Sequence, residues 1–424
     1  MPEVTDDTPV HLTEVDVDLD VQEILLAASQ HDQSKLRRLL RTQSMLPDAA
    51  NVKDTETGFS PLHAAIAACE PDTEPAGANG AATSDSNPKG LDAETVKSAV
   101  ETVKFLLQEG AIWNDLDANN ETPGCIARRI GALELYELIV DAGVRAELLL
   151  NRLDAYEELA DDDDDEEEEE EEAEAEAETE TAPELVDASA EPATETTTTT
   201  TPANPEVSNS QYLESRLNIQ NDRILDSDQN GVMMRWESDI MRKSATALLP
   251  TPGLKVLNIG HGMGIVDGFF QEQGPAVHHI VEAHEEVVAE MKRRGWDTKP
   301  GVVIHQGRWQ DILPGLVAAG ETFDAIYYDT FAESYGDFRD FFSEQVIGLL
   351  EQEGRWGFFN GMGADRQISY DVYQKVAEMD LFEAGFDVQW EEISVPKLDG
   401  EWDGVRRAYW VVDDYRLPLC KFMD

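Results

Sequence analysis

The sequence predicts an α/β domain that follows a smaller helical domain and an acidic linker. Residues 208–424 combine aromatic and β-branched runs with glycine turns, which is typical of an α/β domain. Residues 1–153 are rich in Ala and Leu at helical spacing. Residues 154–207 are of low complexity, with 22 acidic residues and no Lys or Arg between Glu157 and Glu195. A chain of 424 residues has room for two or three domains.

The charge of the chain argues against several classes of function. Lys and Arg number 32 against 88 Asp and Glu, which gives a formal net charge of −56. Such a chain repels phosphate backbones, so no direct nucleic-acid partner is expected, whereas basic proteins are attracted to it. Acidity that only keeps the chain soluble is the open alternative. The sequence has no uninterrupted run of about 18 apolar residues, so no membrane span is expected.

The cysteines and the first residues bear on the compartment. Cys69, Cys125 and Cys420 lie far apart and form no CxxC pair, so neither a disulfide framework nor a metal site is expected. The first residues, MPEVTDDT, are acidic and do not resemble a secretory signal. We therefore expect a soluble protein in a reducing, intracellular compartment.

The first region contains an internal repeat. The segment 58–65, GFSPLHAA, recurs in weaker form at 120–127 as NETPGCIA. Proline after Ser or Thr is typical of the first turn of a helix, where its missing N–H costs nothing. The repeat resembles the ankyrin motif, whose unit of about 33 residues predicts about three units with an insertion near residues 70–97. Ankyrin arrays bind proteins; a generic domain of helical hairpins is the alternative.

The linker at 154–207 is expected to stay extended and disordered. Its Asp/Glu block repels itself and has little apolar surface to bury. Glu and Ala both favour helix, so a helical Glu-Ala stretch remains a second interpretation.

The chemistry is expected in the third region, where strands end in glycines or acids. The apolar segment 254–259 runs into Gly260, Gly262 and Gly264, and glycines there let the backbone pass close to a ligand. A second strand, 277–282, ends in Glu282, whose carboxylate can accept hydrogen bonds from both hydroxyls of a ribose. The glycine pattern alone also fits dinucleotide-binding folds.

Two further strands complete the expected crevice. The segment 302–306 leads to Trp309, and the segment 323–328 leads to Asp329. Ligands of open α/β sheets bind at the carboxyl ends of the strands, so these side chains should lie near the glycine turn and Glu282.

This set of motifs resembles the class I S-adenosylmethionine-dependent methyltransferases, and more closely guanidinoacetate methyltransferase. Three stretches carry the resemblance: 232–237 with Met241, 256–266, and 328–330. Together with the ankyrin-like region, the layout is similar to that of the type IV protein arginine N-methyltransferases. The resemblance implies a seven-stranded, Rossmann-like sheet and methyl transfer from S-adenosyl-L-methionine to the δ (bridging) nitrogen of arginine, which gives N5-methylarginine. It further implies basic protein substrates, ribosomal proteins included, and a monomer in the cytoplasm and nucleus.

The resemblance also assigns roles to residues. Glu237 and Asp329 would be catalytic, because a carboxylate pair can fix a guanidinium and take up the proton released on methylation. The expected cofactor-binding residues are Tyr212, Met233, Met241, Gly260, His261, Gly262, Met263, Gly264, Ile265, Val266, Glu282, Ala283, His284, Trp309, Gln310 and Asp329. One residue departs from the family pattern: Asn258 stands where an acid is usual.

Two other functions remain open from the sequence. A small-molecule enzyme acting on guanidinoacetate would share the same motifs, although it would need no protein-docking region. An ankyrin scaffold with an inactive methyltransferase domain is the second, although Glu237, Asp329, Glu282 and the glycine turn are all intact.

Overall fold

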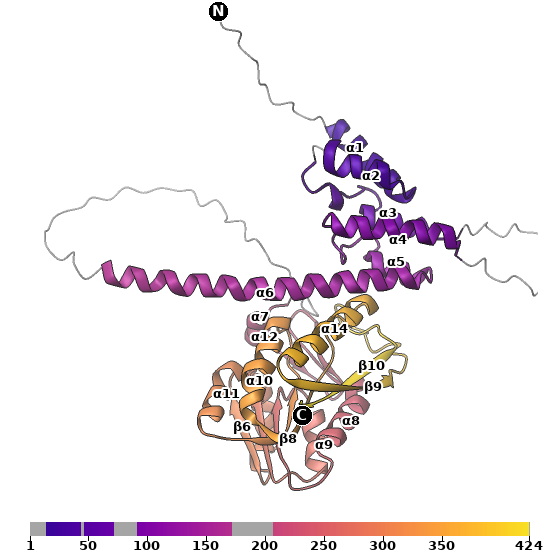
Figure 1. Cartoon of the computed structure of the whole chain (residues 1–424). Coiled ribbons are helices and arrows are strands. Elements are labelled where there is room, and N and C mark those ends of the chain that lie inside the picture. The colour runs from indigo at the N-terminus through magenta and orange to yellow at the C-terminus, as the bar shows by residue number, and fades with distance from the viewer. Residues whose placement is uncertain (1–13, 44–45, 72–90, 172–206, 424) are drawn as a thin grey trace, which may run out of the picture. The chain divides into compact units, whose positions relative to one another are not determined.

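The computed structural model describes residues 14–43, 46–71, 91–171 and 207–423 (Figure 1). Its residues fall into two compact units. The first comprises the chain up to Val144 together with Arg366–Val372, and the second comprises Arg145–Asp365 and Tyr373 onward. Within the described part of the chain, no helix combines the length and the apolar character that crossing a membrane requires.

The first unit is helical. Its helices are α1 (Glu14–Ser29), α2 (Gln33–Arg38), α3 (Pro61–Ala67), α4 (Ala93–Gln108), α5 (Pro123–Arg129) and the beginning of α6 (Leu133–Glu171), with single turns at Leu39–Gln43 and Ala49–Asn51. In α3 the Ser60 side chain accepts a hydrogen bond from the N–H of His63, and Pro61 lies in the first turn. In α5 the same two roles fall to Thr122 and Pro123. Both copies of the sequence repeat therefore begin a helix in the same way.

The expected insertion and linker lie only partly within the described residues. Residues 72–90 of the insertion are outside them, and α4 begins at Ala93 within the stretch expected to be inserted. α6 continues past residue 153, where the linker was expected to begin, as far as Glu171. Residues 172–206 are not described, so the disorder of that segment and the ankyrin assignment stay predictions.

The second unit is built on a seven-stranded sheet. Its strands are β4 (Lys255–Ile259), β5 (Val277–Glu282), β6 (Val302–Gln306), β7 (Phe323–Tyr328), β8 (Leu350–Phe358), β9 (Phe386–Ser394) and β10 (Asp414–Phe422). They lie in the order β6-β5-β4-β7-β8-β10-β9. The first five are parallel, and β10 is antiparallel to both neighbours. The predicted seven-stranded α/β sheet is confirmed.

The register of the central strands brings the predicted site together. Ile259 of β4 is paired with Val281 of β5 and with Tyr328 of β7. Each of these residues is at or next to the carboxyl end of its strand, so Gly260, Glu282 and Asp329 follow at one edge of the sheet. The crossover in strand order at β4 creates the crevice in which open α/β sheets bind ligands.

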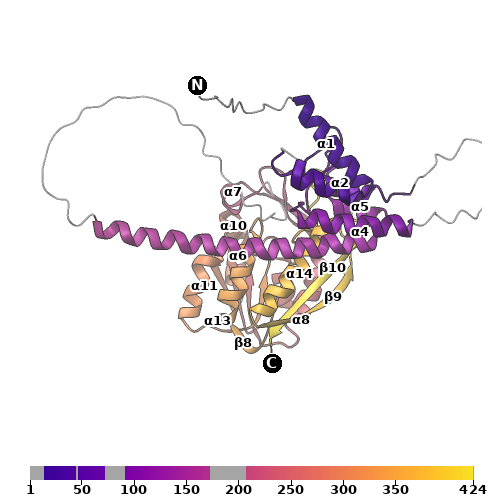
Figure 2. The same ribbon diagram turned by 45° about the horizontal axis from the view of Figure 1, so that its top comes forward.

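Helices cover both faces of the sheet. They are α8 (Ser238–Leu248), α9 (Ile265–Glu272), α10 (Glu285–Arg293), α11 (Trp309–Ala318), α12 (Tyr335–Asp340), α13 (Ile347–Leu349) and α14 (Gln367–Glu383). α8 and α9 bury Met241 and Phe270 against Val256 of β4. On the other face, Phe341 lies 6.1 Å from Trp356 of β8, ring centre to ring centre. Figure 2 shows α11 and α13 on the opposite side of the sheet from α8.

In the sequence of the second unit, two small elements precede the first strand of the large sheet, β4. A single-turn helix, α7 (Asn209–Glu214), is followed by a three-stranded sheet of β1 (Asn218–Ile219), β2 (Arg223–Leu225) and β3 (Gly231–Met234). β3 leads into a short 3₁₀ turn, Arg235–Glu237, which places Glu237 at the start of α8.

Candidate functional site

The glycine turn after β4 approaches the end of β7 closely. Gly260, Gly262 and Gly264 have φ values of 90°, 52° and 75°, a left-handed conformation that favours glycine. A Cβ on Gly260 would lie 1.9 Å from the carbonyl oxygen of Asp329. A Cβ on Gly262 would lie 2.7 Å from the sulfur of Met233. The turn is therefore glycine-rich because backbone and side chains crowd it from two sides.

Glu282 holds this turn in place. Its Oε2 accepts hydrogen bonds from the backbone N–H groups of His261 (2.8 Å) and Gly262 (3.3 Å). Its Oε1 accepts one from the N–H of His284 (2.8 Å). Glu282 as a residue is 6% exposed and lines a cavity, so the remaining lone pairs of its carboxylate are available to a ligand.

The acid that is usual in the family at position 258, where this chain has Asn258, is supplied from nearby, by Asp267 on α9. The Asn258 amide donates to Gly260 O (2.7 Å) and to Asp267 Oδ1 (2.9 Å). Asp267 also accepts hydrogen bonds from His261 Nδ1 (2.6 Å) and His278 Nε2 (2.9 Å). Burial alone would raise the pKa of Asp267, but the charge and hydrogen bonds of these histidines lower it to about 2. An ionised acid thus supports the turn from behind.

The first cavity lies over the carboxyl ends of β4 and β5 and holds about 600 Å³ of open space. Eight of the predicted residues line it: Tyr212, Met233, Gly260, Gly262, Glu282, Ala283, Trp309 and Asp329. The lining also includes Asn209, Leu213, Val232, Ile259, Val281, Gly307, Arg308, Thr330, Phe331 and Glu333. An acidic strand end, a glycine turn and aromatic side walls suit a nucleoside with ribose hydroxyls.

The other eight residues expected at the cofactor are not among those that line this cavity: Met241, His261, Met263, Gly264, Ile265, Val266, His284 and Gln310. Met241 is fully buried in the core beneath the site. The His284 ring lies 4.9 Å from that of Tyr212, and its Nε2 donates to Ser215 O (3.1 Å). The amide atoms of Gln310 are buried, with no hydrogen-bond partner among the described residues.

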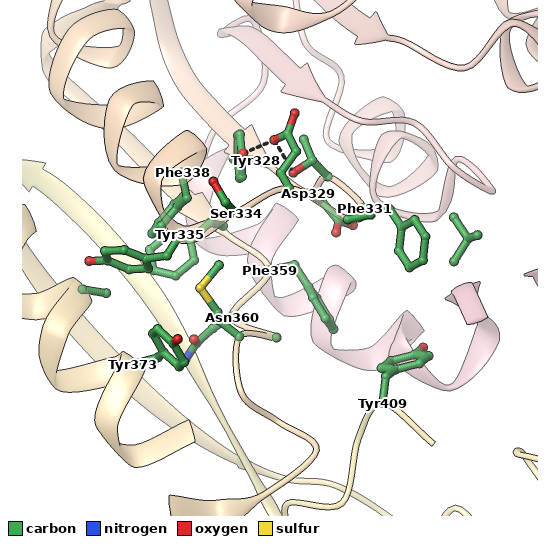
Figure 3. Close-up of a pocket in the computed structure, with 18 of the residues that line it drawn as sticks. Tyr328, Asp329, Phe331, Ser334, Tyr335, Phe338, Phe359, Asn360, Tyr373 and Tyr409 are labelled. Atoms are coloured by element: carbon green, nitrogen blue, oxygen red, sulfur yellow. Dashed lines mark hydrogen bonds between the residues drawn. The ribbon is translucent and has the colours of Figure 1, made fainter. Parts of the chain in front are cut away.

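The second cavity adjoins the first and holds about 1040 Å³ of open space. Both cavities share Val232, Asp329, Thr330, Phe331 and Glu333. The second is further lined by Gly231, Glu237, Tyr328, Ala332, Ser334, Tyr335, Phe338, Phe358, Phe359, Asn360, Gly361, Met362, Tyr373, Ala377 and Tyr409. Figure 3 shows Phe331 and Tyr409 on one side of it and Tyr335, Phe338 and Tyr373 on the other.

Both predicted catalytic carboxylates face this second cavity. Burial, together with the charges of Asp267 and Glu282, raises the pKa of Asp329 to about 7. Burial and the charge of Asp329 raise the pKa of Glu237 well above its usual range. Asp329 Oδ2 is buried without a hydrogen-bond partner in the described part of the chain. Glu237, only 4% exposed, accepts a hydrogen bond from the Tyr409 hydroxyl.

The charges around this cavity select for a cation. Its lining contains three carboxylates, Glu237, Asp329 and Glu333, and no Lys, Arg or His from the described residues. Buried carboxylates without a positive partner are costly, and a bound guanidinium would supply both charge and N–H donors. The described residues hold no cluster of His, Cys, Asp or Glu that could bind a metal ion.

Sequence reasoning missed Glu333 and Tyr409. Glu333 Oε1 accepts a hydrogen bond from Trp309 Nε1 (3.0 Å), and its Oε2 accepts one from the Thr330 hydroxyl (2.8 Å) and another from the Tyr328 hydroxyl. Glu333 follows Asp329 by only four residues, so its closeness in sequence to a strand end could have marked it as a candidate site residue. Tyr409 comes from the connection between β9 and β10, 172 residues from Glu237, and no motif marks it.

Comparisons with known proteins agree with this geometry. The guanidinoacetate N-methyltransferase family profile matches residues 208–405. A protein named protein arginine N-methyltransferase 2 from Aspergillus fumigatus is 71% identical, over 96% of this chain and 97% of its own length. Proteins of the same name from Aspergillus oryzae and Neurospora crassa are 70% and 47% identical. They match over 97% and 95% of this chain, and over 99% and 96% of their own lengths.

Proposed function

Because the chain belongs to the protein arginine N-methyltransferase 2 family, we propose that it transfers a methyl group to the δ (bridging) nitrogen of arginine side chains in proteins. The product is N5-methylarginine, and ribosomal proteins are among the basic substrates. The observation that carries this proposal is a pair of carboxylates, the buried Glu237 and Asp329 with its buried Oδ2, facing a cavity without a cationic side chain among the described residues.

S-adenosyl-L-methionine is the expected cofactor, and the first cavity fits it. Glu282 would accept hydrogen bonds from the ribose, and Trp309 and Tyr212 would flank the base. The glycine turn leaves room beside Met233 that a Cβ would fill. When bound, the cofactor supplies a methyl group on a sulfonium, and the electrons of the broken S–C bond return to sulfur as a thioether.

The carboxylate pair would bind the guanidinium and receive its proton. Asp329 lines both cavities, so a guanidinium bound to it lies at their junction. The nitrogen that forms the new N–C bond loses one proton, and a carboxylate whose pKa is raised toward neutrality is suited to accept it. A guanidinium in water has a pKa above about 12, so it does not lose a proton readily at neutral pH. The carboxylate pair therefore has to hold the acceptor nitrogen in place while the proton leaves it.

The lining favours an arginine residue over free guanidinoacetate. Guanidinoacetate carries its own carboxylate, which would enter a cavity lined by three carboxylates and, among the described residues, no cationic side chain. An arginine within a polypeptide has no such charge next to its side chain. Repulsion between like charges at close range therefore disfavours the small-molecule substrate.

The first unit is proposed to dock the protein substrate. Its two Pro-initiated helices and the ankyrin-like repeat in its sequence support this role, and the net charge of −56 attracts basic proteins.

One experiment separates the candidate functions. The full-length protein is incubated with methyl-labelled S-adenosylmethionine and either a basic protein extract or guanidinoacetate, and the labelled products are fragmented by mass spectrometry. We expect label in protein, on the bridging nitrogen of arginine. Label in guanidinoacetate alone would make the chain a small-molecule enzyme. Cofactor binding by calorimetry without any labelled product would favour an inactive scaffold.

A further inference from the structure

The connection between β9 and β10, residues 395–413, is fastened over the second cavity at several points. Arg223 of β2 donates to Asp403 O (2.9 Å), and the N–H of Arg406 donates to Gln229 O (2.8 Å). The N–H of Val411 donates to Ala364 O (2.9 Å). Backbone bonds and an arginine side chain thus fix a long connection that has little secondary structure of its own.

This connection places Tyr409 directly against Glu237. The Tyr409 hydroxyl donates to Glu237 Oε1, and the Tyr409 ring packs 6.1 Å from Trp236 and 4.9 Å from Trp402, centre to centre. Gly231 of β3 makes room for it, because a Cβ there would lie 2.9 Å from the tyrosine ring. The Tyr409 hydroxyl is therefore held at Glu237 Oε1 by three features together: the space left by Gly231, the hydrogen bonds of the connection, and the packing of the tyrosine ring against two tryptophans.

The hydroxyl limits how Glu237 can bind a guanidinium. Tyr409 is the one side chain in the described part of the protein that donates to Glu237, and it donates to Oε1, while the backbone of Met234 also bonds to the carboxylate. A carboxylate with two free oxygens can bind a guanidinium as a fork, through any of its paired N–H edges. With Oε1 engaged by the hydroxyl, Glu237 does not present two free oxygens to a ligand, whereas Asp329 offers its unpartnered Oδ2. Two single contacts on different nitrogens fix an orientation that a fork leaves open.

We propose that Tyr409 determines which guanidinium nitrogen is methylated, by occupying Glu237 Oε1 and so preventing a two-oxygen fork. The proposal rests on the proposed function, in which the bridging nitrogen is the acceptor. Tyr409 is a positioning residue, since it acts through Glu237. In either orientation the balance is the same: the S–CH₃ bond breaks, an N–CH₃ bond forms, and the acceptor nitrogen gives one proton to a carboxylate.

The test is Tyr409→Phe in the full-length protein, with the methylated nitrogen located by mass spectrometry. We expect the ratio of terminal-nitrogen to bridging-nitrogen product to rise about tenfold or more, the change that one hydrogen bond to a charged group can supply. Affinity for S-adenosylmethionine, measured by calorimetry, should stay within about twofold. The affinity of the variant for an arginine peptide, measured without cofactor, should also differ from that of the native protein, because Glu237 Oε1 is no longer occupied.

A matched control is Tyr415→Phe, which removes a buried hydroxyl that accepts from the N–H of Asn360 (3.0 Å). It should lower the melting temperature without adding terminal-nitrogen product. If Tyr409→Phe does not fold, Gly231→Ala displaces the same ring and should shift the ratio in the same direction. Terminal-nitrogen product from the native enzyme would contradict the proposed function. Bridging-nitrogen product alone from a folded Tyr409→Phe or Gly231→Ala variant would overturn the role of Tyr409.

Discussion

At the scale of single residues, the ionisation of Asp329 links the structure to the pH dependence of the reaction. Burial and the nearby carboxylates raise the pKa of Asp329 to about 7 in the free protein. Only the ionised form attracts a guanidinium, and its fraction grows as the pH rises through that value. We therefore expect kcat/KM for an arginine peptide to increase as the pH is raised from about 6 to 8, since this ratio reports groups of the free enzyme.

The Asp329→Asn variant tests this assignment. The amide is nearly isosteric, so the fold and the affinity for S-adenosylmethionine should persist. Turnover should fall by about 10²–10⁴-fold, and the rise in kcat/KM through pH 7 should disappear. Asp324→Asn is a matched control, because Asp324 accepts from Lys255 N (2.8 Å) at the opposite end of the same strand. Near-native turnover in Asp329→Asn would remove this residue from the catalytic pair.

Glu282 makes a second prediction at this scale. Glu282→Gln replaces an acceptor by a donor that faces the N–H groups of the turn, and it weakens any ribose contact. Affinity for S-adenosylmethionine should fall by about 2–3 kcal/mol in calorimetry, the value of one or two hydrogen bonds to a charged group. The control is Glu285→Gln, an exposed position at the start of α10. Equal affinities of Glu282→Gln and the native protein would exclude Glu282 from the cofactor site.

At the scale of elements, Asp267 connects α9, β5 and the glycine turn. Because folding lowers its pKa from 3.8 to about 2, the carboxylate contributes stability above pH 4, and that contribution is lost as the pH falls toward 2. Asp267→Asn leaves His261 and His278 without their acid. It should lower the free energy of unfolding by about 3–5 kcal/mol at pH 7.

Urea unfolding at a series of pH values checks this. The difference in stability between native and Asp267→Asn proteins should shrink between pH 4 and pH 2, where the native carboxylate takes up its proton. A difference that stays constant over this range would mean that the aspartate acts through packing and not through charge.

The elements also show what could be predicted from the sequence. The parallel strands, the glycine turn and Glu282 follow a local pattern of apolar runs that end in glycine or an acid, so sequence periodicity is enough to find them. Met241, which only the family resemblance placed at the cofactor, is buried in the core and is not among the residues that line the first cavity. Tyr409 could not be predicted, since only the fastening of a long loop brings it to Glu237.

At the scale of the whole molecule, the boundary of the second unit lies earlier than the expected start of the methyltransferase domain at 208. The unit begins at Arg145, on α6. Within it, Arg339 donates to Asn151 O (2.7 Å) and the Tyr373 hydroxyl donates to Glu147 (3.1 Å). A chain that starts at 208 lacks both partners and leaves Arg339 without this bond.

The short segment Arg366–Val372 belongs to the first unit, although the residues before and after it belong to the second. There, Ile368 is buried next to Gly124, and Asp371 accepts a hydrogen bond from the Tyr136 hydroxyl (2.5 Å). Removing residues 1–144 uncovers Ile368 and Val372. Exposure of two such side chains costs about 3–6 kcal/mol.

We therefore expect stability to fall in the order full length, 145–424, 208–424, measured as the melting temperature of each protein. Cofactor affinity should be similar in all three where they are folded, because every residue that lines the first cavity lies after 208. On a short arginine peptide, 145–424 should keep most of the native kcat/KM, whereas on an intact basic protein it should lose more, since the proposed docking unit is missing. Equal losses on peptide and protein would show that the first unit stabilises the enzyme without selecting its substrate. Equal melting temperatures of 145–424 and 208–424 would show that Glu147 and Asn151 do not stabilise the second unit.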